Sequence, residues 1–177
     1  MKNYFGIAAL AAGYLLMPTA VMAAETADSA TITKLLAEAK SEAADLKHDS
    51  ADMEMFTKSK LSWATYAGKV DMIRDHVNNT GKLLAKLQAA EPDGSPWQRT
   101  AIQRIEPLLR ELAANTEETI NQLNQNRTKI HFQEFRDLTI ANCDLATNLE
   151  ALIAEFVSYG QSKQKMEQLK LKVKGIS

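Results

Sequence analysis

The sequence contains few of the residues that interrupt helices. Its 177 residues include 7 glycines and 4 prolines, while good helix formers such as alanine, leucine, glutamate, lysine and glutamine are abundant. Strands joined by tight turns need frequent glycine and proline, so this scarcity disfavours an all-β fold. The length fits a single domain.

Cysteine and excess basic charge are also scarce. The single cysteine, Cys143, excludes an internal disulfide framework, a Cys-x-x-Cys redox site and covalent attachment of a c-type haem. It could bridge two chains in a homodimer, but a reduced, half-buried thiol is the simpler expectation. The formal net charge of -1 disfavours nucleic acid as a partner.

Catalytic and cofactor motifs are missing as well. The chain has no Gly-rich phosphate loop, no Gly-x-Ser-x-Gly elbow and no His-Glu-x-x-His zinc helix. A di-iron bundle needs two Glu-x-x-His motifs, and the nearest spacing, Asp45-x-x-His48, occurs once. For an axial haem pair, His76 lies beside the apolar stripe of its helix, where we expect a surface residue, and Met166 lies near the chain end. We therefore expect no enzyme activity, no metal and no cofactor.

The first 23 residues have the pattern of a cleavable signal peptide. Lys2 is followed by the apolar run Tyr4–Met17, and Val21–Ala23 has the small residues that signal peptidase reads. The run is shorter than the roughly 20 residues of a transmembrane helix, and no later stretch reaches about 18 apolar residues. We expect cleavage after Ala23, a periplasmic or secreted location, and no transmembrane span in the mature chain. The alternative is an uncleaved N-terminal anchor.

Apolar residues recur at helical spacing in four later runs. The runs predict helices at about 31-56, 60-90, 96-126 and 132-174, after a flexible segment at 24-30. Because the breaks are short, consecutive helices must be antiparallel. We predict an all-α fold, an elongated antiparallel up-down-up-down four-helix bundle over residues 31-174. The alternative is a pair of helical hairpins that dimerises to complete a bundle.

Local signals mark where these helices begin or become irregular. Ser95–Gln98 has the pattern of an N-cap with a capping box, which predicts the start of the third helix. Pro107 lies inside the third run and is expected to kink it. Glu42 and Asp49 occupy positions of the first run where large apolar residues are expected, so that helix is expected to fray or curve there.

The fourth run has two apolar stripes. The first stripe is Phe135, Asn142, Leu149 and Phe156. The second is Leu138, Leu145, Leu152, Tyr159, Met166 and Val173. Both stripes are expected to face the core from one long helix that continues through Gly160, although glycine inside a helix costs roughly 1 kcal/mol.

A polar layer is predicted inside the bundle. When the third and fourth helices are aligned about a turn near residue 129, Asn142 faces Thr116, and Thr119 faces Thr139. A buried asparagine can fix the register and the number of packed helices. We expect this structural role for Thr116, Thr119 and Asn142, and the alternative is a ligand site.

Charge is unevenly distributed along the chain. Residues 25–54 carry eight acids and three lysines, whereas residues 161–175 carry Glu167 and five lysines: Lys163, Lys165, Lys170, Lys172 and Lys174. In an antiparallel bundle the start of the first helix lies beside the end of the fourth, so these segments are expected to be neighbours that attract weakly. The alternative is a basic surface that contacts anionic lipid or a cell-wall polymer.

Several stretches of sequence carry a resemblance: His76–Asn79, Gly81–Leu84, Ser95–Gln98 leading to Ala101–Ile102, and Arg104–Leu109. In these stretches the chain resembles a group of exported bacterial helical proteins with no assigned activity. The resemblance covers nearly all of the mature region and implies the fold and the compartment, but no catalytic residue. The group is expected to have Thr-Pro at the start of the fourth helix, where this chain has Phe132-Gln133.

Taken together, these features predict an exported, non-enzymatic helical-bundle protein. It would act as a structural, scaffolding or protein-binding component of the cell envelope, with an envelope protein or a surface polymer as its partner. The alternative is a carrier of a small ligand, haem or a metal that uses the bundle interior.

Overall fold

The computed structural model describes residues 27–59, 61–125, 127 and 133–175. Its elements are α1 (Ala30–Phe56), α2 (Trp63–Ala90), the short 3-10 helix η1 (Glu91–Asp93), α3 (Pro96–Gln125) and α4 (Gln133–Gly175). The predicted helix ends differ from these by three residues or fewer. The predicted signal peptide, residues 1-23, lies outside the described residues.

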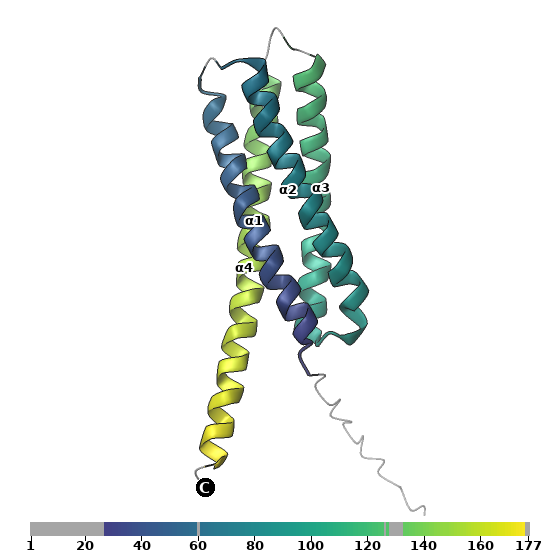
Figure 1. The fold of residues 1–177 in the computed structure, drawn as a ribbon, viewed down its shortest axis with the longest axis vertical. Helices are drawn as coiled ribbons and strands as arrows, with labels where there is room; N and C mark the ends of the chain where they lie inside the picture. Colours follow the sequence, from purple (N-terminus) through teal and green to yellow (C-terminus); the bar gives the residue numbers. More distant parts are fainter. Residues whose placement is uncertain (1–26, 60, 126, 128–132, 176–177) are drawn as a thin grey trace, which may run out of the picture.

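The four α-helices run alternately up and down and form one bundle (Figure 1). α1 packs against α2 and α4, and α3 packs against the same two helices. In the described ranges every regular element is helical. The predicted all-α antiparallel four-helix bundle is therefore confirmed. α4 has 43 residues and reaches beyond the end of the other helices.

The core consists of apolar side chains at heptad spacing. Most of the buried positions on α2 and α3 recur at alternating intervals of three and four residues: Tyr66, Val70, Ile73, Val77, Thr80, Leu84 and Leu87 on α2, and Ile102, Ile105, Leu109, Leu112, Thr116, Thr119 and Leu123 on α3. Full burial of one large aliphatic side chain contributes roughly 1.5–3 kcal/mol. These stripes stabilise the bundle together with the buried residues of α1 and α4.

The second stripe predicted for α4 is wrong over its C-terminal half. Beside Phe135, Asn142 and Leu149, the buried residues are Thr139, Ala146, Ile153 and Gly160. Among the predicted residues, Leu152 is buried, Leu138 and Leu145 are half-buried, and Tyr159, Met166 and Val173 are exposed. Small side chains bring the backbone of α4 close to its neighbours, so the leucines are turned to the flanks of the contact.

The fraying expected within α1 does not occur. The helix is continuous from Ala30 to Phe56, and Asp49 is buried within it. Its carboxylate is tolerated because Lys69 and His76 of α2 contact it. In α3 the helix continues through Pro107 from Pro96 to Gln125.

Candidate functional site

α4 extends beyond the ends of the helices that pack against it (Figure 1). Gly160 is its last buried residue, and from residue 161 to 175 every side chain is exposed except the half-buried Lys163. At 1.5 Å rise per residue, this segment is roughly 20 Å long. We call residues 161–175 the α4 extension. Across the described helices, no apolar stretch is long enough to cross a membrane.

The α4 extension carries apolar side chains along one face. Met166, Leu169 and Val173 follow one another at three and four residues, which places them in one line, and Tyr159 lies one heptad before Met166. All four side chains are more than half exposed. We call these four residues the apolar stripe. Leu171 is also exposed, but at 100° per residue it lies on the opposite side of the helix.

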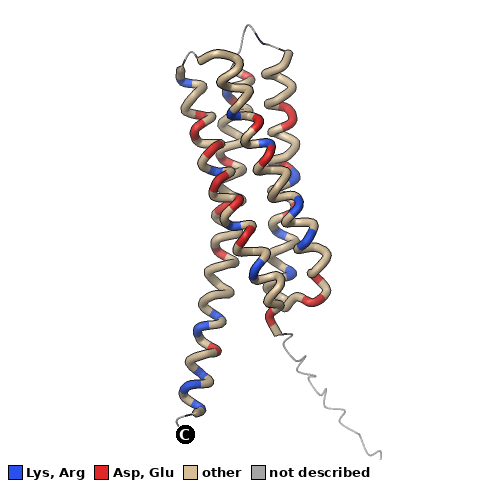
Figure 2. The backbone as a smooth tube through the Cα atoms, viewed as in Figure 1, with Lys and Arg blue, Asp and Glu red and all other residues tan. Residues whose placement is uncertain are grey.

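The lysines of the candidate basic surface lie along both edges of the apolar stripe. Figure 2 shows them as a series of blue segments on the α4 extension. By helical spacing, Lys163, Lys170 and Lys174 border one edge, and Lys165 and Lys172 border the other.

These lysines are only in part neighbours of the acidic segment at the start of α1. Lys163 meets Asp28 just before α1 begins, and its ammonium lies 2.9 Å from the Asp28 carboxylate. The later lysines lie beyond this point because α4 extends past the start of α1. The predicted contact between the acidic and basic segments therefore occurs at Lys163 and does not extend to the later lysines.

The α4 extension is anchored where it leaves the bundle. The Trp97 indole of α3 donates a hydrogen bond to Asp28 Oδ1 at 2.8 Å, and Lys163 Nζ donates to the same oxygen at 2.9 Å. The Trp97 ring meets Tyr159 edge to face, with the centroids 5.4 Å apart. The segment just before α1 thus meets α3 and α4 at one point, which fixes the direction in which the extension projects.

Asp28 is the charged centre of this anchor. Burial raises the pKa of its carboxyl, but hydrogen bonds from Lys163, Ser95 and Trp97 together lower this pKa by more. The net pKa therefore lies below the ordinary value of 3.8. The carboxylate therefore stays ionised at neutral pH and keeps its attraction for Lys163.

Gln98 joins α1 to α3 beside this anchor. Its side chain is fully buried, and its Oε1 accepts hydrogen bonds from the backbone N–H groups of Ser95 and Ser29 at 3.1 and 2.8 Å. Its Nε2 donates to the Ser29 carbonyl at 2.9 Å. The residue expected to close a capping box within α3 thus also binds the N-cap of α1. Asp28 and Ser29, which lie in the segment expected to be flexible, are held by these contacts.

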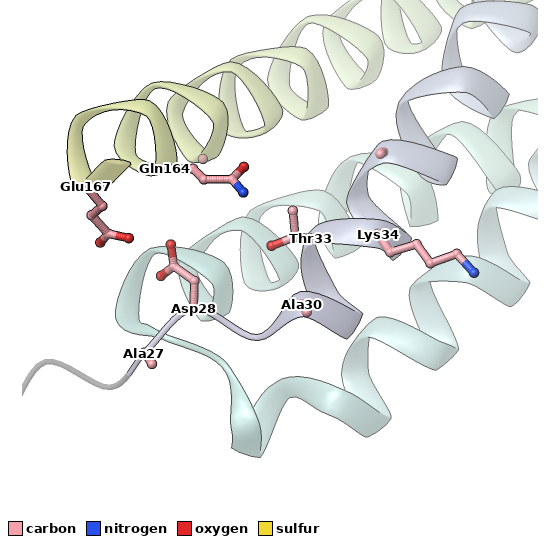
Figure 3. A pocket seen from close by; sticks show the side chains of 9 residues that line it. Ala27, Asp28, Ala30, Thr33, Lys34, Gln164 and Glu167 are labelled. Atoms are coloured by element: carbon pink, nitrogen blue, oxygen red, sulfur yellow. The ribbon is translucent and has the colours of Figure 1, made fainter. Parts of the chain in front are cut away.

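A cleft of about 500 Å³ opens between the start of α1 and α4 (Figure 3). Gln164 and Glu167 project into it from α4, opposite Asp28 and Thr33. The face of the extension turned towards α1 is therefore polar, and the apolar stripe lies elsewhere on the helix. Because Lys163 and Trp97 already engage Asp28, the cleft offers few groups that could converge on a ligand.

A second groove lies on the other side of α4, where the apolar stripe meets the bundle. It has a volume of about 350 Å³ and is lined by Trp97, Thr100, Arg104, Glu155, Phe156 and Tyr159. The Arg104 guanidinium lies over the Phe156 ring, 5.7 Å from its centroid. The groove thus continues the apolar stripe, through Tyr159, onto the bundle.

A charge network joins α1 to α2. Lys69 Nζ lies 2.9 Å from Asp49 and 3.1 Å from Asp52, and His76 lies 2.6 Å from Glu42 and 3.3 Å from Asp49. His76 was expected on the surface, but it is half-buried because carboxylates of α1 contact both ring nitrogens. Burial lowers the pKa of Lys69, but the two aspartates raise it by more, to a net value above 10.5.

The same network contains the one group of potential metal-ligating atoms found among the described residues. Ligand atoms of His48, Asp49 and Asp52 lie within 4.8 Å of one another. However, Lys69 forms ion pairs with both aspartates. The geometry is that of an ion-pair network, because the ammonium takes the place that a cation would need.

The residues of the predicted polar layer lie together in the interior. The Asn142 Nδ2 donates to Thr119 Oγ1 at 3.0 Å, and the Thr116 hydroxyl lies 3.1 Å from Asn142 Oδ1. All three residues are buried. The Thr119 hydroxyl donates to the Asn115 carbonyl of its own helix, and the Thr116 hydroxyl shares its one proton between Asn142 Oδ1 and the Leu112 carbonyl. The side chains satisfy one another, which fits a structural layer.

Cys143 is half-buried on α4. Burial raises the pKa of its thiol, and the charges of Glu54 and Asp144 raise it further. Because the thiolate is the reactive form, these surroundings slow disulfide exchange with a second chain.

The histidine and methionine considered for haem do not face one cavity. His76 contacts Glu42 in the middle of α1, whereas Met166 is exposed on the α4 extension, beyond the contact of Lys163 with Asp28. Two axial ligands must reach opposite faces of the same iron, and this separation prevents that.

Comparisons with known proteins give no relative: no family model, no curated protein and no solved structure matches the chain. The functional argument therefore rests on the geometry of the described residues.

Proposed function

We propose that the protein is an exported, non-enzymatic helical bundle that binds another protein of the cell envelope through its α4 extension. The observation that carries this proposal is the extension itself, which holds Met166, Leu169 and Val173 of the apolar stripe outside the bundle. Large apolar side chains grouped on one exposed face are typical of interaction sites. The role is that of a structural or scaffolding component.

The architecture supports this role because the binding surface is preformed. An isolated helix of this length is marginal in water, but the extension continues a long helix that is anchored by Trp97 and Asp28. It can therefore present the apolar stripe as a preformed surface, which lowers the entropy cost of binding.

Export is proposed from the N-terminal sequence pattern, Lys2 followed by Tyr4–Met17 and Val21–Ala23.

Export can be tested by fractionating cells that make the chain with a C-terminal tag. We expect the protein in the exported fraction with Ala24 as its first residue. Recovery only from the cytoplasm, with Met1 retained, would contradict export.

Partner binding can be tested by placing a photo-crosslinking amino acid at Leu169 in one variant and at Asp71 in another. Both side chains are exposed, but Asp71 lies on α2, away from the extension. We expect one discrete crosslinked species from position 169 and none from position 71. Equal crosslinking from both positions, or from neither, would contradict a binding role for the extension.

The alternative of a carrier that uses the bundle interior is not favoured by the polar layer, since Asn142 bonds to Thr116 and Thr119. Absorbance spectra and metal analysis of protein purified from the exported fraction separate the two functions. A Soret band or a stoichiometric metal would contradict the binding role.

A further inference from the structure

We infer that the apolar stripe and its lysines bind a helix whose own apolar seam is flanked by acidic residues, so that the two helices form a short coiled coil. The inference rests on the proposed function and names the chemistry of the partner. It depends on the heptad positions of the α4 extension.

The apolar stripe follows a coiled-coil heptad. If Tyr159 is an a position, Met166 and Val173 are the next two a positions, and Leu169 is the d position between them. At 100° per residue the stripe covers about 80° of the helix surface. A two-helix seam is this narrow, whereas helices that lie in a lipid surface have a wider apolar face that is rich in tryptophan, phenylalanine and leucine. The width favours a helix over a membrane as the partner.

The lysines specify the charge of that partner. In the same register Lys163 and Lys170 are e positions, and Lys165 and Lys172 are g positions. Residues at e and g face the partner helix and determine which helices pair. With lysine at each of these positions, the most favourable partner carries glutamate or aspartate at its own e and g positions.

The same charges disfavour pairing between two copies of the extension. In a parallel pair g faces e of the partner, and in an antiparallel pair e faces e and g faces g. Every one of these contacts would bring lysine against lysine.

Lys163 already contacts Asp28, so Lys165, Lys170 and Lys172 are the residues through which an acidic helix is recognised.

The partner helix would reach the bundle at the groove beside Tyr159. Trp97 and Phe156 line this groove, and Arg104 adds a further positive charge. One apolar side chain at the end of an acidic helix could therefore dock there, which would set how far the helix slides along the extension.

Two synthetic heptad peptides test the inference. Both have about 21 residues with the same apolar a and d positions, and they differ only in glutamate or lysine at e and g. With the purified mature chain at about 150 mM salt, we expect the glutamate peptide to bind at least about tenfold more tightly than the lysine peptide in titration calorimetry, with weaker binding at higher salt. Equal affinity for the two peptides, or binding of neither, would overturn the inference.

A matched pair of variants locates the binding face. Leu169→Glu replaces a leucine of the apolar stripe by a charged side chain of similar size. Leu171→Glu introduces the same charge on the opposite side of the same helix. Both leucines are exposed, so both variants should fold with unchanged melting temperatures. We expect Leu169→Glu to weaken binding of the glutamate peptide by about tenfold or more and Leu171→Glu to leave it unchanged. Equal loss in both variants would overturn the inference.

Two further measurements test whether a lipid surface or a second copy of the chain binds the apolar stripe instead of an acidic helix. Tight binding to vesicles of phosphatidylglycerol without binding of the glutamate peptide would replace the inference with a lipid surface. A dimer in sedimentation that Leu169→Glu dissociates would replace it with a second copy of the chain. If position 169 crosslinks to an envelope protein but the glutamate peptide does not bind, the inference fails and the proposed function stands.

Discussion

The Trp97 ring of α3 lies against Gly160 of α4, so closely that a Cβ atom added to the glycine would lie 2.8 Å from the ring. Trp97 has little freedom to move away, because its indole N–H binds Asp28 and its edge meets Tyr159. This contact explains why α4 tolerates a glycine in its interior. It is also the point from which the α4 extension projects.

Gly160→Ala should destabilise the protein even though alanine is the better helix former. The added methyl group would displace Trp97, and overpacking of this kind typically costs about 1–3 kcal/mol. Gly81→Ala is the matched control, because nothing lies within 4 Å of the Cβ position at Gly81, and it should gain up to about 1 kcal/mol. Thermal unfolding compares the two variants, and a higher melting temperature for Gly160→Ala would contradict the close contact.

Asn142→Leu should leave the stability unchanged or raise it by about 1 kcal/mol. Without the amide, Thr116 and Thr119 still donate to the carbonyls of Leu112 and Asn115, so neither hydroxyl loses every partner. Denaturant unfolding measures the change, and Leu149→Ala, which creates a cavity on the same helix, serves as the destabilising control. If Asn142→Leu destabilised the protein as much as that control, the layer would have a role beyond helix register.

Periodicity was sufficient to predict the fold and the level of the polar layer. Thr116 and Asn142 could be placed opposite each other because α3 and α4 are regular and the connection between them is short. Only part of the buried face of α4, Phe135, Asn142 and Leu149, could be found in this way. Leu138 and Leu145 are more hydrophobic than Thr139 and Ala146, yet the smaller residues are buried because they let the helices approach.

The anchor and the charge network depend on distances that the sequence pattern does not contain. Trp97 and Asp28 are 69 residues apart in sequence, and no local signal indicates that they meet. Glu42 and Asp49 were recognised as anomalies in an apolar stripe, but their partners Lys69 and His76 lie on another helix. A search for cations at the same level of the neighbouring helix could have proposed these pairs.

Lys69→Met should destabilise the protein by about 3 kcal/mol, because it leaves the buried Asp49 carboxylate without its ammonium partner. The double variant Lys69→Met with Asp49→Leu should recover most of this loss, because it removes the unpaired charge. Chemical denaturation of the wild type, the two single variants and the double variant gives the coupling between the residues. Additive losses would show that the pair does not act as one unit.

The Cys143 thiol should react slowly with a disulfide reagent at neutral pH. Its pKa is raised by burial and by Glu54 and Asp144, so the folded protein holds less thiolate than the unfolded chain. Glu54→Gln should speed the reaction, since it removes one negative charge beside the thiol. The rate of release of a chromophore from an aromatic disulfide measures the effect, and a rate equal to that of the denatured protein would contradict it.

Asp28→Asn should destabilise the protein at neutral pH by about 1.5 kcal/mol, since it weakens the hydrogen bonds from Lys163 and Trp97. The folded-state pKa of Asp28 lies below 3.8, so its stabilising contribution is complete above that pH and is lost as the pH falls through the folded-state value. The difference in melting temperature between wild type and variant should therefore be constant at mildly acidic and neutral pH and shrink below pH 3.8.

Asp71→Asn, at an exposed pair with Arg74, serves as the control and should change the stability by only tenths of a kcal/mol. A gap that persists unchanged in strong acid would contradict the ionised Asp28 as the centre of the anchor.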